Sequence, residues 1–297
     1  MGYDYVAMLE DTKKLLADFP FVEQETIGTS VMKKPIFSLK IGTGKKSLFI
    51  NCAHHGLEYL TSAFIMRFLR EYASLCEKRE AFFGYDAFLL SKKVTLFVVP
   101  MVNPDGVDIA VNGLDITNPY HQKLISMVGI HSFNKVWQAN ARGVDINHNY
   151  NALWRSVSKK PAPTKYSGPY SESEPETKAI IEFVREKKFD MLIAFHSQGR
   201  EIYYDFDGLA AENSRKVADK MAKESGYLVA TPVGSASFGG CKDWFIKEFG
   251  KAGFTVEIGS GKNPLKMEQL EEIYEENAKI ILAAMEEIIL DGKSLGK

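Results

Sequence analysis

The chain has 297 residues, 45% of them hydrophobic and 25% charged, a composition typical of a globular protein with a large core. Its 37 basic and 38 acidic side chains give a formal net charge of -1, which argues against non-specific binding to nucleic acid or to an anionic membrane. The three cysteines, Cys52, Cys76 and Cys241, form no CxxC motif, and such a sparse, odd set fits a reducing compartment better than a disulfide scaffold.

The first segment, residues 1–24, predicts an amphipathic helix. It has no positively charged stretch followed by an apolar one, so it lacks the pattern of a signal peptide. No apolar run in the sequence approaches the roughly 20 residues that a membrane-spanning helix needs. We therefore expect a cytoplasmic protein that does not bind membranes.

Strands are expected at several apolar runs further along the chain. PIFSLKIG (35–42) and KSLFINCA (46–53) flank the turn-like TGKK and predict two paired strands. Further apolar or β-branched strands are expected at 93–102, 189–197 and 253–259.

Helices are expected between these strands. Apolar residues recur at helical spacing from Gly56, and a long helix is expected from Met267 onward. Ser173 and Glu176 have the spacing of a capping box, which predicts the start of another helix. This alternation predicts an α/β fold over a single domain, residues 1–297, with a mixed sheet covered on both faces. The long stretch 102–172 is irregular and rich in glycine and asparagine, which is typical of a functional segment.

His54, His55 and Glu58 lie where a predicted strand becomes a predicted helix. A His-x-x-Glu pair places two suitable zinc ligands one turn apart, so both can face one point. The signal is weak by itself, and for this stretch alone two ordinary histidines at the end of a strand are the favoured interpretation. The order of the residues excludes the helical HExxH arrangement.

His196 is the only one of the six histidines that ends a predicted apolar strand, MLIAFHS. Open α/β sheets bind ligands at the carboxyl ends of their strands, although a semi-buried histidine with an ordinary hydrogen bond is an equal alternative. A ligating histidine also needs an acceptor for its other ring nitrogen, and Asp145 in GVDINHN is available.

Five motifs occur in one order along the chain: HGLE (55–58), NPDG (103–106), ARGVDIN (141–147), AFHS (194–197) and FTVE (254–257). In this combination the sequence resembles the zinc metallocarboxypeptidases, the carboxypeptidase A-like peptidases, over essentially residues 30–290. The resemblance implies the α/β fold of that family, a single domain with an eight-stranded mixed β-sheet flanked by helices. It also implies an enzyme, a zinc metallopeptidase with one Zn²⁺ ion.

Position by position, the resemblance assigns His55, Glu58 and His196 as the zinc ligands. Asp145 corresponds to the carboxylate that orients His55. His54 falls where the family has a residue that is not a ligand.

Two further residues correspond to catalytic residues of the family. Glu257 corresponds to the general base, which takes a proton from water and gives it to the departing nitrogen. The alternative for Glu257 is a structural glutamate paired with a buried lysine or arginine. Arg142 corresponds to the arginine that holds the developing oxyanion, where a fixed donor supplies roughly 3 kcal/mol; its alternative is a surface salt bridge.

The sequence departs from carboxypeptidases at positions that bind the substrate. Asn147-His148 stands where carboxypeptidases have Asn-Arg to hold the C-terminal carboxylate, and a histidine is a weaker and pH-dependent partner. Ser235 stands at the position of the mobile tyrosine of carboxypeptidase A. Other aromatic candidates for lining the site are Tyr203, Tyr204 and Phe238.

The segments RGVDINHNYNALW, TKYSGPYSESEPET, SFGGCKDWFIKEFG and FTVEIGSGKNPL resemble the bacterial branch of the family that cleaves γ-D-glutamyl-diamino acid bonds in cell-wall peptides. This resemblance implies a muropeptide derived from peptidoglycan, such as L-Ala-γ-D-Glu-meso-diaminopimelate, cut after D-Glu. We expect Asn147 and His148 to contact a substrate carboxylate and Asp243 to contact the distant ammonium. The alternative for Asp243 is a helix cap. Gly239 and Gly240 predict a tight turn or a close backbone approach.

The leading hypothesis is a zinc peptidase that hydrolyses the γ-D-glutamyl-diamino acid bond. The runner-up is a broad-specificity metallocarboxypeptidase acting on α-linked peptides, against which His148 and Ser235 argue. A zinc deacylase of N-acyl amino acids is a third enzyme class, but the contexts of NPDG and FTVE fit peptidases better. Retention of the three ligands together with Glu257 and Arg142 argues against a non-catalytic muropeptide-binding protein. No nucleic-acid partner is expected, and the sequence leaves the oligomeric state open.

Overall fold

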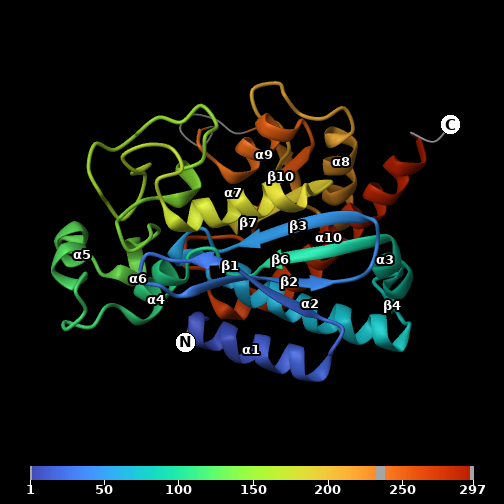
Figure 1. Cartoon of the computed structure of the whole chain (residues 1–297), viewed down its shortest axis with the longest axis horizontal. Coiled ribbons are helices and arrows are strands. Elements are labelled where there is room, and N and C mark those ends of the chain that lie inside the picture. Colours follow the sequence, from blue (N-terminus) through green and yellow to red (C-terminus); the bar gives the residue numbers. More distant parts are fainter. Residues whose placement is uncertain (1, 232–237, 295–297) are drawn as a thin grey trace.

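The computed structural model describes residues 2–231 and 238–294 (Figure 1). Its α-helices are α1 (Tyr5–Asp18), α2 (Leu60–Lys78), α3 (Ala87–Lys93), α4 (Pro104–Asn112), α5 (His121–Val128), α6 (Phe133–Val136), α7 (Pro175–Lys187), α8 (Ser214–Ser225), α9 (Cys241–Phe249) and α10 (Leu270–Ser294). Its strands are β1 (Glu23–Thr29), β2 (Pro35–Ile41), β3 (Lys46–Cys52), β4 (Ala81–Phe82), β5 (Tyr85–Asp86), β6 (Val94–Val99), β7 (Met191–Ser197), β8 (Glu201–Tyr203), β9 (Leu228–Ala230) and β10 (Ala252–Ile258). Short 3₁₀ turns are η1 (Gly56–Glu58), η2 (Ile146–His148) and η4 (Met267–Gln269).

Eight of the described strands form one mixed sheet in the order β1-β2-β6-β3-β7-β10-β8-β9. At its centre β6, β3, β7 and β10 are parallel, whereas β2 and β8 pair antiparallel with β6 and β10. Every residue of β7 is buried, as expected for a central parallel strand covered on both faces. The predicted α/β fold with an eight-stranded mixed sheet is confirmed. That residues 1–297 form a single catalytic domain stays a prediction.

The predicted pairing of the two strands around TGKK is wrong. β6 lies between β2 and β3 in the sheet and pairs with both. The connection from β2 to β3 crosses the start of β6: the N–H of Thr43 donates to the carbonyl of Ser91 at 2.8 Å. A Cβ on Gly44 would lie 2.0 Å from the carbonyl carbon of Lys93. Glycine thus allows a close crossing of two backbones, which its sequence does not distinguish from a hairpin turn.

Two predicted helix boundaries also differ from the structure. The helix expected over residues 1–24 ends at Asp18, and residues 23–29 form the edge strand β1. This strand is mostly exposed and polar, so it lacks the apolar alternation that predicts a strand. The capping box at Ser173 and Glu176 does not form. Instead α7 begins at Pro175, and the Glu176 carboxylate accepts a hydrogen bond from the N–H of Val31 at 2.9 Å.

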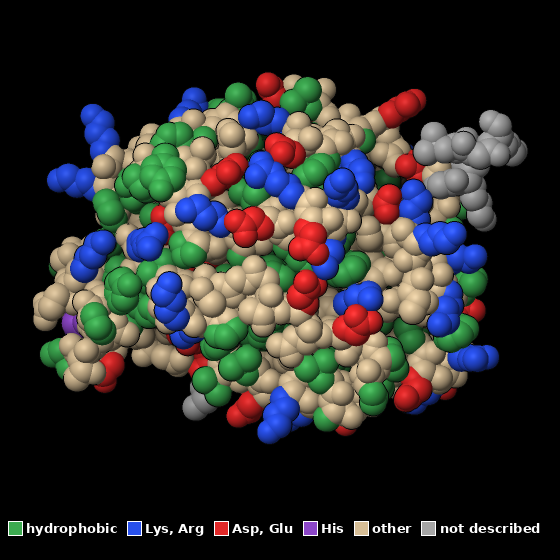
Figure 2. Space-filling model, in the orientation of Figure 1, with side chains coloured by type: hydrophobic (Ala, Val, Ile, Leu, Met, Phe, Trp, Pro, Cys, Tyr) green, Lys and Arg blue, Asp and Glu red, His purple; other side chains and the backbone are tan. Residues whose placement is uncertain are grey.

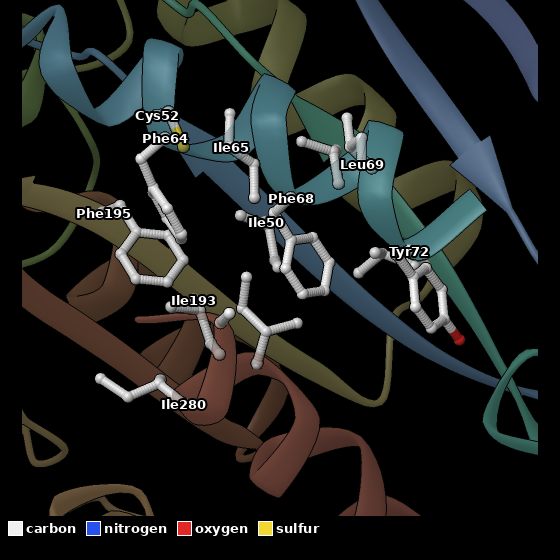
Figure 3. Close-up of a cluster of buried hydrophobic side chains, with 14 of the residues drawn as sticks. Ile50, Cys52, Phe64, Ile65, Phe68, Leu69, Tyr72, Ile193, Phe195 and Ile280 are labelled. Atoms are coloured by element: carbon white, nitrogen blue, oxygen red, sulfur yellow. The ribbon is translucent and has the colours of Figure 1, made fainter. Parts of the chain in front are cut away.

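Helices cover both faces of the sheet. In Figure 1, α7 and α9 lie on one side of the sheet and α1 and α2 on the other. Phe49 and Leu192 face α7 and α9, whereas the adjacent Ile50 faces the core with α2 and α10. Figure 3 shows this second core, in which the rings of Phe64 and Phe195 meet edge to face with centroids 5.1 Å apart. Side chains that alternate along each strand thus form two cores, one on each face.

The surface carries charges of both signs side by side. Figure 2 shows lysine and arginine side chains interspersed with aspartate and glutamate, with no broad area of one sign on this face. This agrees with the small net charge. Among the helices described, none combines the length and the apolar character needed to cross a membrane. The expected cytoplasmic location stays a prediction.

Candidate metal centre and catalytic site

The site lies at the carboxyl ends of the central strands. The chain leaves β3 three residues before His55, β7 contains His196 and β10 contains Glu257. Glu257 and His196 are paired in register across the parallel β7–β10 ladder. Residues paired in register point to the same face of a sheet, so the two strands place these side chains next to each other.

His55, Glu58 and His196 form one group that can hold a metal ion. Nδ1 of His55 lies 2.9 Å from Oε1 of Glu58, and Nδ1 of His196 lies 2.9 Å from Oε2 of the same carboxylate. One ligand atom from each residue lies within 4.8 Å of the other two. Burial raises the pKa of Glu58, but the two histidines outweigh it and lower that pKa to about 2. Two imidazoles and an ionised carboxylate are a usual ligand set of catalytic zinc, so these residues fit the predicted ion.

The NPDG segment holds the loop that carries His55. Oδ1 of Asn103 accepts a hydrogen bond from the N–H of Gly106 at 2.9 Å, and its amide donates to the carbonyl of His54 at 2.9 Å. Gly56 approaches α4 so closely that a Cβ would lie 2.3 Å from the Gly106 carbonyl oxygen. The cap of α4 and the close approach of Gly56 together fix the direction in which His55 enters the site.

Asp145 holds the other ring nitrogen of His55. Its Oδ1 lies 3.0 Å from Nε2 of His55, and its Oδ2 accepts a hydrogen bond from the N–H of Lys165 at 3.1 Å. Burial raises the pKa of Asp145, but His55 and His148 outweigh it and hold that pKa below its usual range. Burial lowers the pKa of His55, and the charges of Glu58 and Asp145 more than reverse this effect.

His54 lies outside the metal group. It is buried, and its Nε2 lies 2.9 Å from the hydroxyl of Tyr150. Its ring stacks on His196 with centroids 5.4 Å apart. Burial lowers the pKa of His54 well below its ordinary value, so the ring is neutral and supports His196 by packing.

Glu257 is half-buried beside the metal group. Burial raises its pKa well above the ordinary value of a glutamate, and the negative charges of Glu58 and Glu201 raise it further. Within residues 2–231 and 238–294, Glu257 forms no ion pair with a lysine or an arginine. The structural alternative of a buried glutamate with such a partner is therefore absent from the described residues.

Arg142 is held on the tight loop 140–144. Oδ1 of Asn140 accepts hydrogen bonds from the backbone N–H groups of Arg142 and Val144, at 2.9 and 3.1 Å. Nη1 of Arg142 lies 3.5 Å from Oε2 of the buried Glu174. The side chain is 49% exposed, so one edge of the guanidinium is anchored while the rest faces solvent.

Asn147 and His148 contact the segment that leads into α9. Oδ1 of Asn147 accepts a hydrogen bond from the N–H of Cys241 at 3.0 Å, and Nδ1 of His148 lies 2.8 Å from the carbonyl oxygen of Phe238. Gly239 has a φ of 70°, and a Cβ there would lie 2.5 Å from the carbonyl oxygen of His148. The predicted close backbone approach is confirmed at Gly239.

Asp243 is buried at the start of α9 and already has a cationic partner. Nζ of Lys242 lies 2.6 Å from Oδ1 of Asp243, so the two side chains form an ion pair. This oxygen accepts no hydrogen bond from the described residues. Lys242 also donates to the carbonyl of Asp205 at 2.5 Å. An ammonium group of a ligand would have to compete with Lys242 for this carboxylate. Ser235 lies outside the described residues.

Two cavities share residues with segments that contact the site. One, of about 380 Å³, is lined by residues that include Asn263, whose amide nitrogen lies 3.4 Å from Oε1 of Glu58. The other, of about 430 Å³, is lined by residues that include Asp205 and Phe238. The first cavity adjoins the metal group through Asn263, and the second shares Phe238 with the contact that holds His148.

Sequence reasoning missed Glu201 and Glu174. Glu174 holds Arg142, and Glu201 is the register partner of Glu257 on β8. Tyr203, one of the aromatic candidates, donates a hydrogen bond from its hydroxyl to Glu201. In the sequence, Glu201 is recognisable only as a charged residue that begins the short apolar run EIYY. This pattern does not show that the strand carrying Glu257 lies beside it.

The sequence matches the protein family described as zinc carboxypeptidase over residues 8–280. A gamma-D-glutamyl-L-diamino acid endopeptidase of Lysinibacillus sphaericus is 36% identical over 289 residues, which cover 96% of this chain and 72% of that protein. An uncharacterized protein of Bacillus subtilis is 35% identical over 292 residues, covering 95% of this chain and 77% of that protein. The crystal structure of thrombin-activatable fibrinolysis inhibitor superposes with a TM-score of 0.78 at 20% identity, over 98% of this chain and 75% of that one, which shows a shared fold.

Proposed function

Because the chain belongs to the zinc carboxypeptidase family and is a metallopeptidase, we propose that it hydrolyses the γ-D-glutamyl-diamino acid bond of muropeptides derived from peptidoglycan. The similarity to the endopeptidase of Lysinibacillus sphaericus over 96% of the chain carries this proposal. His148 supports it, because a histidine holds an ordinary C-terminal carboxylate less firmly than the arginine of carboxypeptidases.

Glu257 performs the proton transfers in this proposal. When bound to His55, Glu58 and His196, zinc supplies a Lewis acid for the peptide carbonyl and lowers the pKa of water. The carboxylate of Glu257 accepts a proton from the attacking water and then passes it to the leaving nitrogen, which releases the diamino acid.

Arg142 donates to the oxygen on which negative charge develops during attack. Glu174 anchors one edge of the guanidinium, and Asn140 fixes the backbone from which it projects. A donor held in place before the reaction loses little freedom in the transition state, which is why it stabilises charge effectively.

Asn147 and His148 are assigned to a carboxylate of the substrate, as expected from the sequence. Their contacts with Cys241 and Phe238 fix them against the segment that leads into α9, and Phe238 also lines the second cavity. Asp243 stays a prediction for the distant ammonium, although its ion pair with Lys242 makes it a weak candidate.

Product identification tests the proposed reaction. Zinc-loaded protein is mixed with L-Ala-γ-D-Glu-meso-diaminopimelate and, separately, with an α-linked tripeptide, and Glu257→Gln is the control. We expect release of free diaminopimelate from the first peptide, with kcat lower by about 100-fold or more in the control, the typical contribution of a general base. Zinc content should be equal in the two proteins.

Each different result points to a different activity. Cleavage of the α-linked peptide alone would favour a broad metallocarboxypeptidase, an activity consistent with the family description. Cleavage of neither peptide by the zinc-loaded protein would favour a muropeptide-binding protein or a deacylase.

A further inference from the structure

Glu201 is the next carboxylate in the row that holds the catalytic groups. Glu257 is paired in register with His196 on one side and with Glu201 on the other. Directly opposed residues of an antiparallel pair point to the same face, with Cβ atoms about 5 Å apart. Glu201 is half-buried, and its charge contributes to the raised pKa of Glu257, so the two carboxylates lie close together.

Glu201 has no cationic partner among the described residues. Its hydrogen bond comes from a neutral group, the hydroxyl of Tyr203. Arg200, its neighbour in the chain, pairs instead with Glu272 and Glu276. Two adjacent half-buried carboxylates repel each other, and a cation beside them relieves this repulsion. Zinc would lie on the His196 side of Glu257, so the charge of Glu201 on the other side stays available to a cation of the ligand.

The position of Glu201 places it on the side of the leaving amino acid. In the sheet, β10 separates β7, which carries His196, from β8, which carries Glu201. In the proposed reaction Glu257 gives its proton to the leaving nitrogen, so we expect the amino acid on that nitrogen on the β8 side of Glu257, away from His196. Asp205, which follows two residues after the end of β8, lines the cavity of about 430 Å³.

We propose that Glu201, held by Tyr203, binds the distal ammonium of the leaving diamino acid and thereby sets the preference for diamino over monoamino leaving groups. This inference depends on the proposed function, which supplies the diamino acid. An ionised carboxylate held by a hydrogen bond is a stronger acceptor for an ammonium than a neutral group. Glu201 is a better candidate than Asp243, because Lys242 already neutralises Asp243.

Two peptides that differ by one amino group test the proposal. They are L-Ala-γ-D-Glu-meso-diaminopimelate and the same peptide ending in 2-aminopimelate, which lacks the distal amine. For the zinc-loaded wild type we expect kcat/KM to be higher by about tenfold or more for the diaminopimelate peptide, the effect of one charge-assisted hydrogen bond. In Glu201→Gln, which keeps the side-chain size, the two values should become equal, mainly through a higher KM for the diaminopimelate peptide.

Two further variants control for indirect effects. Tyr203→Phe removes the hydroxyl that orients Glu201 and should lose part of the preference. Glu182→Gln removes the charge of an exposed glutamate on α7 and should keep the full preference.

A Glu201→Gln variant that keeps the wild-type preference would overturn the role of Glu201 and leave the proposed function intact. Calorimetric titration of both peptides into Glu257→Gln, and into the double variant Glu201→Gln/Glu257→Gln, adds a measurement that needs no turnover. Tighter binding of the diaminopimelate peptide should be present in the first protein and absent from the second. Equal binding of both peptides to Glu257→Gln would overturn the inference, whereas failure of the wild type to cleave either peptide would count against the proposed function alone.

Discussion

Asp145 determines how His55 presents Nδ1 to the metal group. Its carboxylate lies 3.0 Å from the opposite ring nitrogen, Nε2. We expect Asp145→Asn to lower zinc affinity by about 10–100-fold, the usual cost of losing such a supporting carboxylate. Competition with a chromophoric zinc chelator at fixed pH measures this change. Asp219→Asn, which removes an exposed carboxylate on α8, should leave the affinity unchanged; equal affinity in the two variants would show that the contact with His55 does not support the metal.

Arg142 is expected to act in the transition state more than in substrate binding. Arg142→Gln should lower kcat by about 100-fold, with little change in KM, because the interaction forms with the developing charge. Glu174→Gln should cause a smaller loss of kcat, since it loosens one edge of the guanidinium and leaves its charge. Steady-state kinetics on one γ-D-glutamyl peptide separates these effects. A rise in KM at unchanged kcat would instead assign Arg142 to ground-state binding.

The metal group could be predicted from the sequence because short motifs carry it. His55 and Glu58 are three positions apart, and His196 ends a strand whose buried run is recognisable. Glu201 could not be found in this way, because its proximity to Glu257 depends on the register between β8 and β10. A three-residue strand has too few positions to show a period, so its sequence does not specify that register.

The contact between η1 and α4 links the metal loop to the rest of the fold. Gly56→Ala would place a Cβ about 2.3 Å from the carbonyl oxygen of Gly106, so one of the two elements must move. We expect a loss of unfolding free energy of about 1–3 kcal/mol, as for other overpacked sites, together with weaker zinc binding. Chemical denaturation and the chelator competition measure the two effects.

Gly250 provides the matched control for Gly56. It follows α9 in the left-handed region, with φ 62°, and a Cβ there would meet no other atom within 4 Å. Asparagine tolerates this conformation, so Gly250→Asn should change stability little. A Gly56→Ala variant as stable as this control would mean that η1 and α4 separate easily.

Strand pairing is less predictable than the existence of the strands. β2, β3 and β6 lie near the positions expected for them, but the crossover through α2 and α3 inserts β6 between the other two. Local periodicity reports which residues are buried, whereas neighbours in a sheet are chosen by contacts between distant segments. The same reason explains Glu176, whose carboxylate binds Val31 across 145 positions of the chain instead of capping its own helix.

Glu176 also connects the stability of the whole molecule to pH. Burial raises its pKa from the ordinary 4.5 to about 7, the charge of Asp105 adds to this, and hydrogen bonds from Val31 and Asn140 offset part of it. Between these two pH values the folded protein holds a proton that the unfolded chain has released. The contribution of Glu176 is therefore fully present below pH 4.5 and is lost as the pH rises through about 7. The complete loss amounts to roughly 3 kcal/mol.

Urea unfolding of wild type and Glu176→Gln between pH 5 and 8.5 tests this dependence, with both proteins kept metal-free so that zinc binding does not enter. The amide that this substitution introduces would face the donor amide of Asn140, which lies 3.1 Å from the Glu176 carboxylate in the wild type, and this contact adds a pH-independent cost to the variant. Against that constant offset, the unfolding free energy of the wild type should fall relative to the variant by roughly 2–3 kcal/mol across the range. Glu182→Gln on the exposed side of α7 should show no such trend. If the difference in unfolding free energy between wild type and Glu176→Gln stays constant with pH, Glu176 is ionised in the folded protein throughout this range. The hydrogen bonds from Val31 and Asn140 would then be sufficient to stabilise its charge.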